Sequence, residues 1–274
     1  MRKQRFLYGC VAAITALSLA SVGQAFEKSE AKTQNALVPT SKIVGSYIYN
    51  AGDESIASVD DIVMNAKGEV QYLIVGVGGV AGLGQSQVAV PCKAVKCSYT
   101  TVDGERECRM TMSMTQEKLN QAPKLEQENH AELMDNNWVT RNRTHFSVDS
   151  ALNDKPAGKL IAYSNVNDVT VQTGNTDQTT NGQLDDLIVD TADHKVKFAV
   201  IGIGGALGIG ESYVAVPFNA LQLTENEDQE YTITTNVTTQ QLNSAPKVTS
   251  PDYSELESQD FQKNVNKMKN SKKQ

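Results

Sequence analysis

The side chains best suited to chemistry are two pairs of adjacent aspartates, Asp60-Asp61 and Asp185-Asp186, and each pair precedes an apolar run. A calcium ion needs several oxygen ligands, and no Asp-x-Asp-x-Asp-Gly loop is present. Neighbouring residues of a strand point to opposite faces, so the two carboxylates of one pair cannot easily hold the same ion. We expect one acid of each pair to cap or hydrogen-bond a turn while the other is solvated. An ion site built from these four acids is the alternative.

The glycine-rich segments from Gly76 to Gly84 and from Gly202 to Gly210 are candidates for phosphate-binding loops. Their spacing differs from that of the dinucleotide-binding motif, and no Gly-Lys-Ser/Thr follows. The next residues in both segments end in Val-Ala-Val-Pro, which is typical of a strand, whereas phosphate motifs require a helix there. These glycines are therefore predicted to permit positive φ and close backbone approach at a corner of a sheet. We expect no cofactor.

Histidine, cysteine and serine patterns give no catalytic or metal-binding motif. His130, His145 and His194 are separated along the chain and form no His/Cys cluster with zinc spacing. No Gly-x-Ser-x-Gly nucleophile elbow occurs, and no Cys-x-x-Cys. We expect neither an enzyme nor a metal site of this kind.

The chain contains an internal duplication, and the duplicated domains must position the residues described above. Gln71–Pro91 reads QYLIVGVGGVAGLGQSQVAVP and Lys197–Pro217 reads KFAVIGIGGALGIGESYVAVP, with every glycine of the first segment repeated in the second. The correspondence continues in Leu119–Lys124 and Leu242–Lys247. A repeat of this size is a domain and not a solenoid turn, so two copies of one domain are expected.

Each copy is predicted to be all-β, because short β-branched and aromatic runs alternate with turn signals and no helical periodicity of similar length occurs. The runs Tyr72–Val75 and Phe198–Ile201 are continuously apolar, which is typical of strands buried on both faces. Short helical turns follow the strands in each copy. Trp138 and Phe261 hold equivalent places near the ends of the two tails, and we expect each to plug its own barrel rather than to bind a partner.

Cysteines occur in the first copy only, once the N-terminal Cys10 is set aside. The run KCSYTTVDGERECR predicts two short strands around a turn at Asp103-Gly104. If the loop is centred near Val102 and Asp103, Cys97 lies opposite Cys108 and the two could form a disulfide. Cys92 would then be left over, so another pairing of Cys92 or an intermolecular bond stays open. Since the second copy has no cysteine, the bridge is expected to stabilise a hairpin and not to act as a redox centre.

Both ends of the chain carry signals for location. Residues 1–25 have a basic start, an apolar stretch and small residues at the end, as in a secretory signal peptide. We therefore expect a periplasmic or secreted protein, and no later stretch reaches the about 20 apolar residues of a membrane helix. The net charge of −7 disfavours nucleic acid as a partner. The lysine-rich residues 262–274 are expected to form a disordered tail, with weak contact to an anionic envelope surface as the alternative.

The repeated pattern resembles the PRC-barrel family. The residues that carry this resemblance are Lys42–Gly45, Val59–Val63, Leu73–Gly84 and Val88–Pro91, with second copies that begin at Lys159, Leu184, Val200 and Val214. The resemblance implies two tandem small antiparallel β-barrels, each with a short helical C-terminal tail, and a role in protein assembly without shared catalytic residues. It divides the chain into a polar leader (26–40), a first barrel with its tail (41–138), a linker (139–157) and a second barrel with its tail (158–261).

These observations favour a non-enzymatic, exported scaffold or protein-binding module whose partner is an envelope protein. The alternative is an ion or small-molecule binding protein that uses the acidic pairs or a groove between the barrels. Loops are where duplicated scaffolds acquire separate tasks. The surface expected to contact a partner comprises the loop inserted in the second copy and the two glycine-rich rims, represented by Gly174, Asn175, Thr176, Asp177, Gly79 and Gly205.

Overall fold

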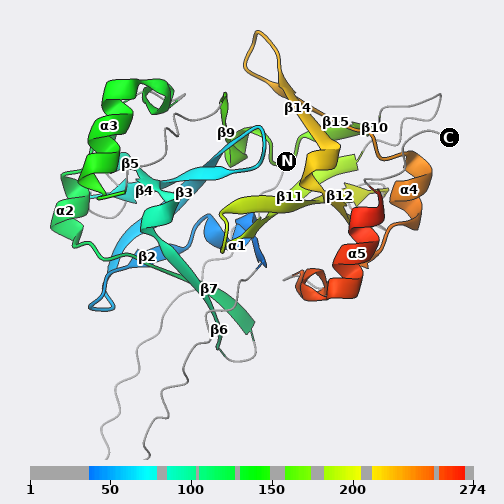
Figure 1. The fold of residues 1–274 in the computed structure, drawn as a ribbon, viewed down its shortest axis with the longest axis horizontal. Helices are drawn as coiled ribbons and strands as arrows, with labels where there is room; N and C mark the ends of the chain where they lie inside the picture. The colour runs from blue at the N-terminus through cyan, green and yellow to red at the C-terminus, as the bar shows by residue number, and fades with distance from the viewer. Residues whose placement is uncertain are drawn as a thin grey trace, which may run out of the picture. The chain divides into compact units, whose positions relative to one another are not determined.

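The computed structural model describes residues 37–78, 85–102, 105–126, 130–148, 158–173, 182–204, 212–249 and 253–268. Within this part of the chain, the strands form two eight-stranded sheets, and each copy of the duplication supplies most of one sheet (Figure 1). The all-β prediction is confirmed, because the helices are short and lie between or after the strands.

The first sheet has the order β6-β7-β2-β3-β4-β5-β8. Neighbours are antiparallel, except that β2 and β7 are parallel. The order is an open path and not a closed ring, so the expected barrel is not closed by strand pairing in the described residues. The strands are β2 (Tyr47–Tyr49), β3 (Ser55–Asn65), β4 (Val70–Val77), β5 (Ser86–Pro91), β6 (Lys96–Val102), β7 (Glu105–Thr111) and β8 (Lys124–Leu125).

The second sheet repeats this order as β14-β15-β10-β11-β12-β13-β16. Here β10 and β15 form the parallel pair. The strands are β10 (Thr170–Thr173), β11 (Gly182–Asp190), β12 (Lys195–Ile203), β13 (Ser212–Pro217), β14 (Leu221–Glu225), β15 (Tyr231–Thr235) and β16 (Lys247–Val248). Strand for strand, the order reproduces the first sheet, as the duplication predicts.

One strand from each copy joins the sheet of the other copy. The first of these, β1 (Leu37–Pro39), pairs antiparallel with β11 of the second repeat. The second, β9 (Leu160–Ala162), pairs antiparallel with β3 of the first repeat. We call β1 and β9 the crossing strands. The expected leader of residues 26–40 was therefore wrong at its end, because residues 37–39 form a strand of a sheet. The match of Lys42–Gly45 with the residues from Lys159 was also wrong, because the strands that the structure makes equivalent are Leu37–Pro39 and Leu160–Ala162.

The predicted linker and the predicted disordered tail were also wrong, because a helix occupies the first part of each. The expected linker of residues 139–157 begins inside a helix, α3 (Asn136–His145), which buries Trp138, Val139 and Asn142. The expected disordered tail of residues 262–274 likewise begins inside α5 (Gln259–Lys267). Ser258 caps the N-terminus of α5, and Val265 of the same helix is fully buried. Burial of this apolar side chain orders the segment in spite of its lysines.

The other helical segments are short. Thr238 caps α4 with a complete capping box, and Thr115 caps α2 through its side chain. None of the described helices has the length and apolar character to cross a bilayer. These segments are α1 (Thr40–Ile43), α2 (Gln116–Asn120) and α4 (Thr239–Ser244), with the 3-10 turns η1 (Cys92–Ala94), η2 (Ala131–Met134), η3 (Tyr163–Asn165), η4 (Phe218–Ala220) and η5 (Ser254–Glu257).

The continuously apolar strands are buried on both faces, as predicted. Along β4, Leu73 and Val75 lie in a central hydrophobic cluster that contains residues of both repeats. The alternate residues Tyr72 and Ile74 lie in a second cluster, which the tail of the first repeat covers. Trp138 belongs to that second cluster, so it packs on the covered face of its own sheet instead of filling a barrel. The two repeats therefore share one core.

Candidate functional site

Asp61 lies where the second repeat crosses to the first. Its Oδ2 accepts a hydrogen bond of 2.5 Å from the hydroxyl of Ser164, in η3 directly after β9. Its Oδ1 accepts from the backbone N–H groups of Ser164 (3.2 Å) and Ile62 (2.7 Å). The side chain is 8% exposed. This carboxylate thus fixes the end of the crossing strand β9.

Asp186 makes the same contacts on the other side of the duplication. Its two oxygens accept from the hydroxyl of Ser41 (2.5 Å) and from the N–H of Ser41 (3.2 Å), which follows β1. Oδ1 also accepts from the N–H of Leu187 at 2.8 Å. Burial raises the pKa of the Asp186 carboxyl from 3.8 to about 6. We call the Ser164–Asp61 and Ser41–Asp186 pairs the two latches.

The first acid of each pair has a different environment. Asp60 is exposed, and its Oδ1 accepts a long hydrogen bond of 3.5 Å from the Ser58 hydroxyl. Asp185 is half-buried, and its Oδ2 accepts from the phenol of Tyr253 at 2.8 Å. The structure therefore does not bring the four acids together as a ligand set. In the described residues, no group of three or more His, Cys, Asp or Glu could hold a metal ion.

The tips of two hairpins meet between the repeats. Val196 donates its backbone N–H to the carbonyl of Gly68 at 2.8 Å, and Val70 donates to the carbonyl of His194 at 2.8 Å. Gly68 has a φ of +76°, and a Cβ built there would lie 2.7 Å from the ring of Phe218. Only glycine fits this close approach without strain.

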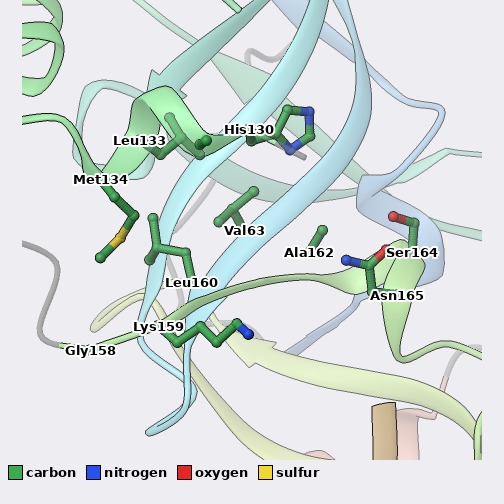
Figure 2. A pocket seen from close by; sticks show the side chains of 11 residues that line it. Val63, His130, Leu133, Met134, Gly158, Lys159, Leu160, Ala162, Ser164 and Asn165 are labelled. Carbon is green, nitrogen blue, oxygen red and sulfur yellow. The ribbon is translucent and has the colours of Figure 1, made fainter. Parts of the chain in front are cut away.

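A groove of about 510 Å³ lies over the first sheet, between η2 and the crossing strand β9. Figure 2 shows Met134 and Leu160 at one end of the groove and Ser164 and Asn165 at the other. Its lining is mainly apolar and includes no carboxylate. Lys159, at the edge, forms an ion pair with Glu225. The apolar lining residues are Val63, Ala131, Leu133, Met134, Leu160 and Ala162.

The two repeats differ at the position that borders this groove. His130 precedes η2 and Tyr253 precedes η5, and both have left-handed backbones, with φ of 52° and 54°. Tyr253 packs on the apolar cluster of its repeat and bonds to Asp185. His130 instead contacts Oε1 of Gln87 at 3.5 Å and lines the groove. This substitution is the sequence signal that could have located the groove.

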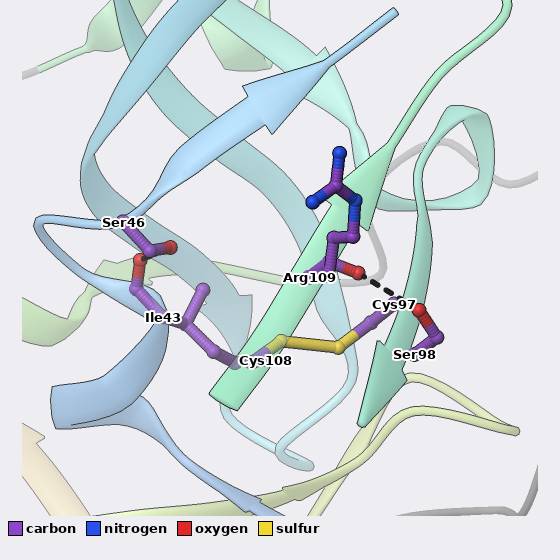
Figure 3. The surroundings of a disulfide bond; sticks show 6 residues. All are labelled: Ile43, Ser46, Cys97, Ser98, Cys108 and Arg109. Atoms are coloured by element: carbon purple, nitrogen blue, oxygen red, sulfur yellow. Dashed lines mark hydrogen bonds between the residues drawn. A yellow bond between two sulfur atoms is a disulfide. The ribbon is translucent and has the colours of Figure 1, made fainter. Parts of the chain in front are cut away.

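The hairpin of β6 and β7 carries the disulfide. The structure joins Cys97 and Cys108, whose Cα atoms are 6.3 Å apart, and Figure 3 shows Ile43 beside Cys108. The strand register pairs Cys97 with Met110 and Tyr99 with Cys108, so the bridge is diagonal and the predicted direct opposition was wrong. The register of β6 and β7 is centred one position later than the expected centre near Val102 and Asp103, so each residue pairs with a partner two positions further along the chain.

Cys92 stays outside this bridge. Its thiol is buried and free of any disulfide, and it donates to the carbonyl of Val70 at 2.8 Å. Burial raises the pKa of this thiol to about 12. A thiol so rarely ionised is a poor nucleophile, so Cys92 acts as a small core residue.

The partner surface expected from the sequence lies outside the described residues. This applies to the two glycine-rich rims, with Gly79 and Gly205, and to the inserted loop with Gly174, Asn175, Thr176 and Asp177. The sequence does not single out the residues of the groove, because their types are ordinary for a partly buried surface.

A family model, the PRC-barrel domain, matches residues 38–105 and 158–240, which is more than half of the chain. The chain belongs to the PRC-barrel family. Each match begins at a crossing strand, so the PRC-barrel repeat as a sequence unit includes a strand that lies on the other repeat's sheet. No curated protein matches the chain.

Proposed function

We propose that this PRC-barrel protein is a non-enzymatic, exported scaffold or protein-binding module. The observation that carries the proposal is the open groove beside β9 in the first repeat, bordered by His130, whose equivalent in the second repeat is Tyr253, bonded to Asp185. A shared hydrophobic core that carries a mainly apolar groove at its surface suits recognition of a partner, and the PRC-barrel family is generally non-catalytic.

Export and an envelope partner are part of this proposal. The signal-like residues 1–25 support export, and the Cys97–Cys108 disulfide is compatible with an oxidising compartment. A periplasmic or secreted location makes other envelope proteins the available partners.

Crosslinking followed by affinity capture of the tagged protein from envelope fractions tests the proposal. We expect recovery of a specific envelope protein, and the same tag on an unrelated exported protein serves as the control. Recovery of nothing, together with a thermal shift on addition of a cation or metabolite, would instead favour ion or small-molecule binding.

A further inference from the structure

The crossing strand β9 has one edge without a strand partner. Its other edge pairs with β3 through Leu160↔Asn65, Ile161↔Met64 and Ala162↔Val63. Within the described chain, no strand pairs with the outer edge of β9. Backbone N–H and C=O groups on such an edge are a template for another strand.

The equivalent edge of β1 carries a proline, and that of β9 does not. Pro39 is paired with Ile188 in β11, as Ala162 is paired with Val63 in β3. A proline has no backbone N–H and is one of the ways in which natural proteins block strand addition. The outer edge of β9 on the first sheet can therefore accept another strand, whereas Pro39 disfavours strand addition at the equivalent edge of β1.

The groove described above runs alongside β9. Leu160 and Ala162 pack on the same apolar cluster as Leu133. Met134 is 43% exposed, which makes it one of the two large hydrophobic side chains exposed in the described residues. The equivalent residue at the end of η5 is Glu257. An apolar recess next to an unpaired edge fits a strand with apolar side chains at alternate positions.

We propose that an extended polypeptide segment of a partner protein binds here by adding a strand to the outer edge of β9. Its alternate apolar side chains enter the groove and contact Met134 and Leu160. This inference rests on the proposed protein-binding function and names its surface. Main-chain hydrogen bonds supply affinity in such complexes, and the recess supplies selectivity for the side chains.

Peptides selected from a phage-displayed dodecapeptide library against the whole protein test the inference, with binding measured by fluorescence anisotropy. We expect the selected peptides to alternate apolar and polar residues. Met134→Arg should weaken their binding by roughly tenfold or more, because it places a charge at the recess. Glu257→Arg is the matched control in the second repeat, and its effect should stay within about twofold.

A second variant tests the strand edge itself. Ala162→Pro copies the residue of β1 and removes one N–H, and the backbone of Ala162, with φ −77° and ψ 140°, already suits proline. It should weaken binding without lowering the melting temperature. Selection of no peptide, or equal binding by wild type and Met134→Arg, would overturn the inference. Dimerisation of the wild type that Met134→Arg abolishes would also overturn it, because the occupant would be a second copy.

The two proposals fail in different ways. If Met134→Arg still captures the same envelope protein from envelope fractions, the protein-binding function stands and the groove is not its surface. If neither the wild type nor the variant captures any protein while peptides still bind the groove, the envelope partner is wrong and the strand-addition site stands.

Discussion

The hydroxyl of Ser164 donates a 2.5 Å hydrogen bond to Oδ2 of Asp61, a residue 103 positions earlier in the chain. Ser41 donates in the same way to Asp186, so the two latches are related by the duplication. Each serine lies two residues after the end of a crossing strand. The latches therefore fix the ends of both crossing strands by charge-assisted hydrogen bonds.

Asp61→Ala should lower the free energy of unfolding by about 2–4 kcal/mol, because Ser164 and Ile62 lose a buried acceptor. Asp60→Ala changes the exposed neighbour and should stay within about 0.5 kcal/mol of the wild type. Urea unfolding followed by circular dichroism measures both. Equal losses for the two variants would contradict the assignment of Asp61 to a latch.

The raised pKa of Asp186, about 6, makes the second latch sensitive to pH. Between about pH 4 and 6 the unfolded chain releases this proton before the folded protein does, so stability should fall as pH rises through this window and then level off. The free energy of unfolding should fall by about 1–3 kcal/mol across this window. Asp186→Asn should remove this pH dependence. The free energy of unfolding is measured for wild type and variant at several values between pH 4 and 7. The same change with pH in both proteins would contradict the prediction.

Gly68→Ala should destabilise the protein by more than the strain of an alanine at positive φ alone would cause. The new Cβ would lie 2.7 Å from Phe218, in addition to the strain of a φ of +76°. Gly45→Ala is a matched control, since its φ is +85° and nothing lies within 4 Å of its Cβ. We expect a cost of about 1 kcal/mol for Gly45→Ala and at least twice that for Gly68→Ala. Thermal unfolding of both variants decides this.

Iodoacetamide should leave Cys92 unmodified in the folded protein, because the thiol is buried and its pKa is about 12. Unfolding in urea should expose it to complete labelling. Mass spectrometry of the peptide that contains Cys92 measures the result. Cys97 and Cys108 are the internal comparison, since both are half-buried and should be labelled only after reduction of their disulfide. Rapid labelling of Cys92 without denaturant would show an accessible thiol.

The duplication and the all-β class could be predicted, because each depends on local patterns. An example is the apolar run Tyr72–Val75 and the glycine-rich segment that follows it. The crossing strands could not, because three residues such as Leu160–Ala162 contain no information on which sheet they join. The continuation of α5 beyond residue 261 was hidden by its lysines, although Phe261 and Val265 lie one helical turn apart. The groove is composed of ordinary residues, and only comparison of the two copies indicates it.

The crossing strands also determine when the chain can fold. Thr40 and Leu187, joined by a 2.9 Å hydrogen bond at the end of β1, are 147 residues apart. β1 therefore has no partner until most of the chain has been synthesised, and contacts of such sequence separation slow folding. A chain cleaved between the repeats would leave edges of β3 and β11 open to pairing with other chains. Completion of either repeat thus waits for the synthesis of the other.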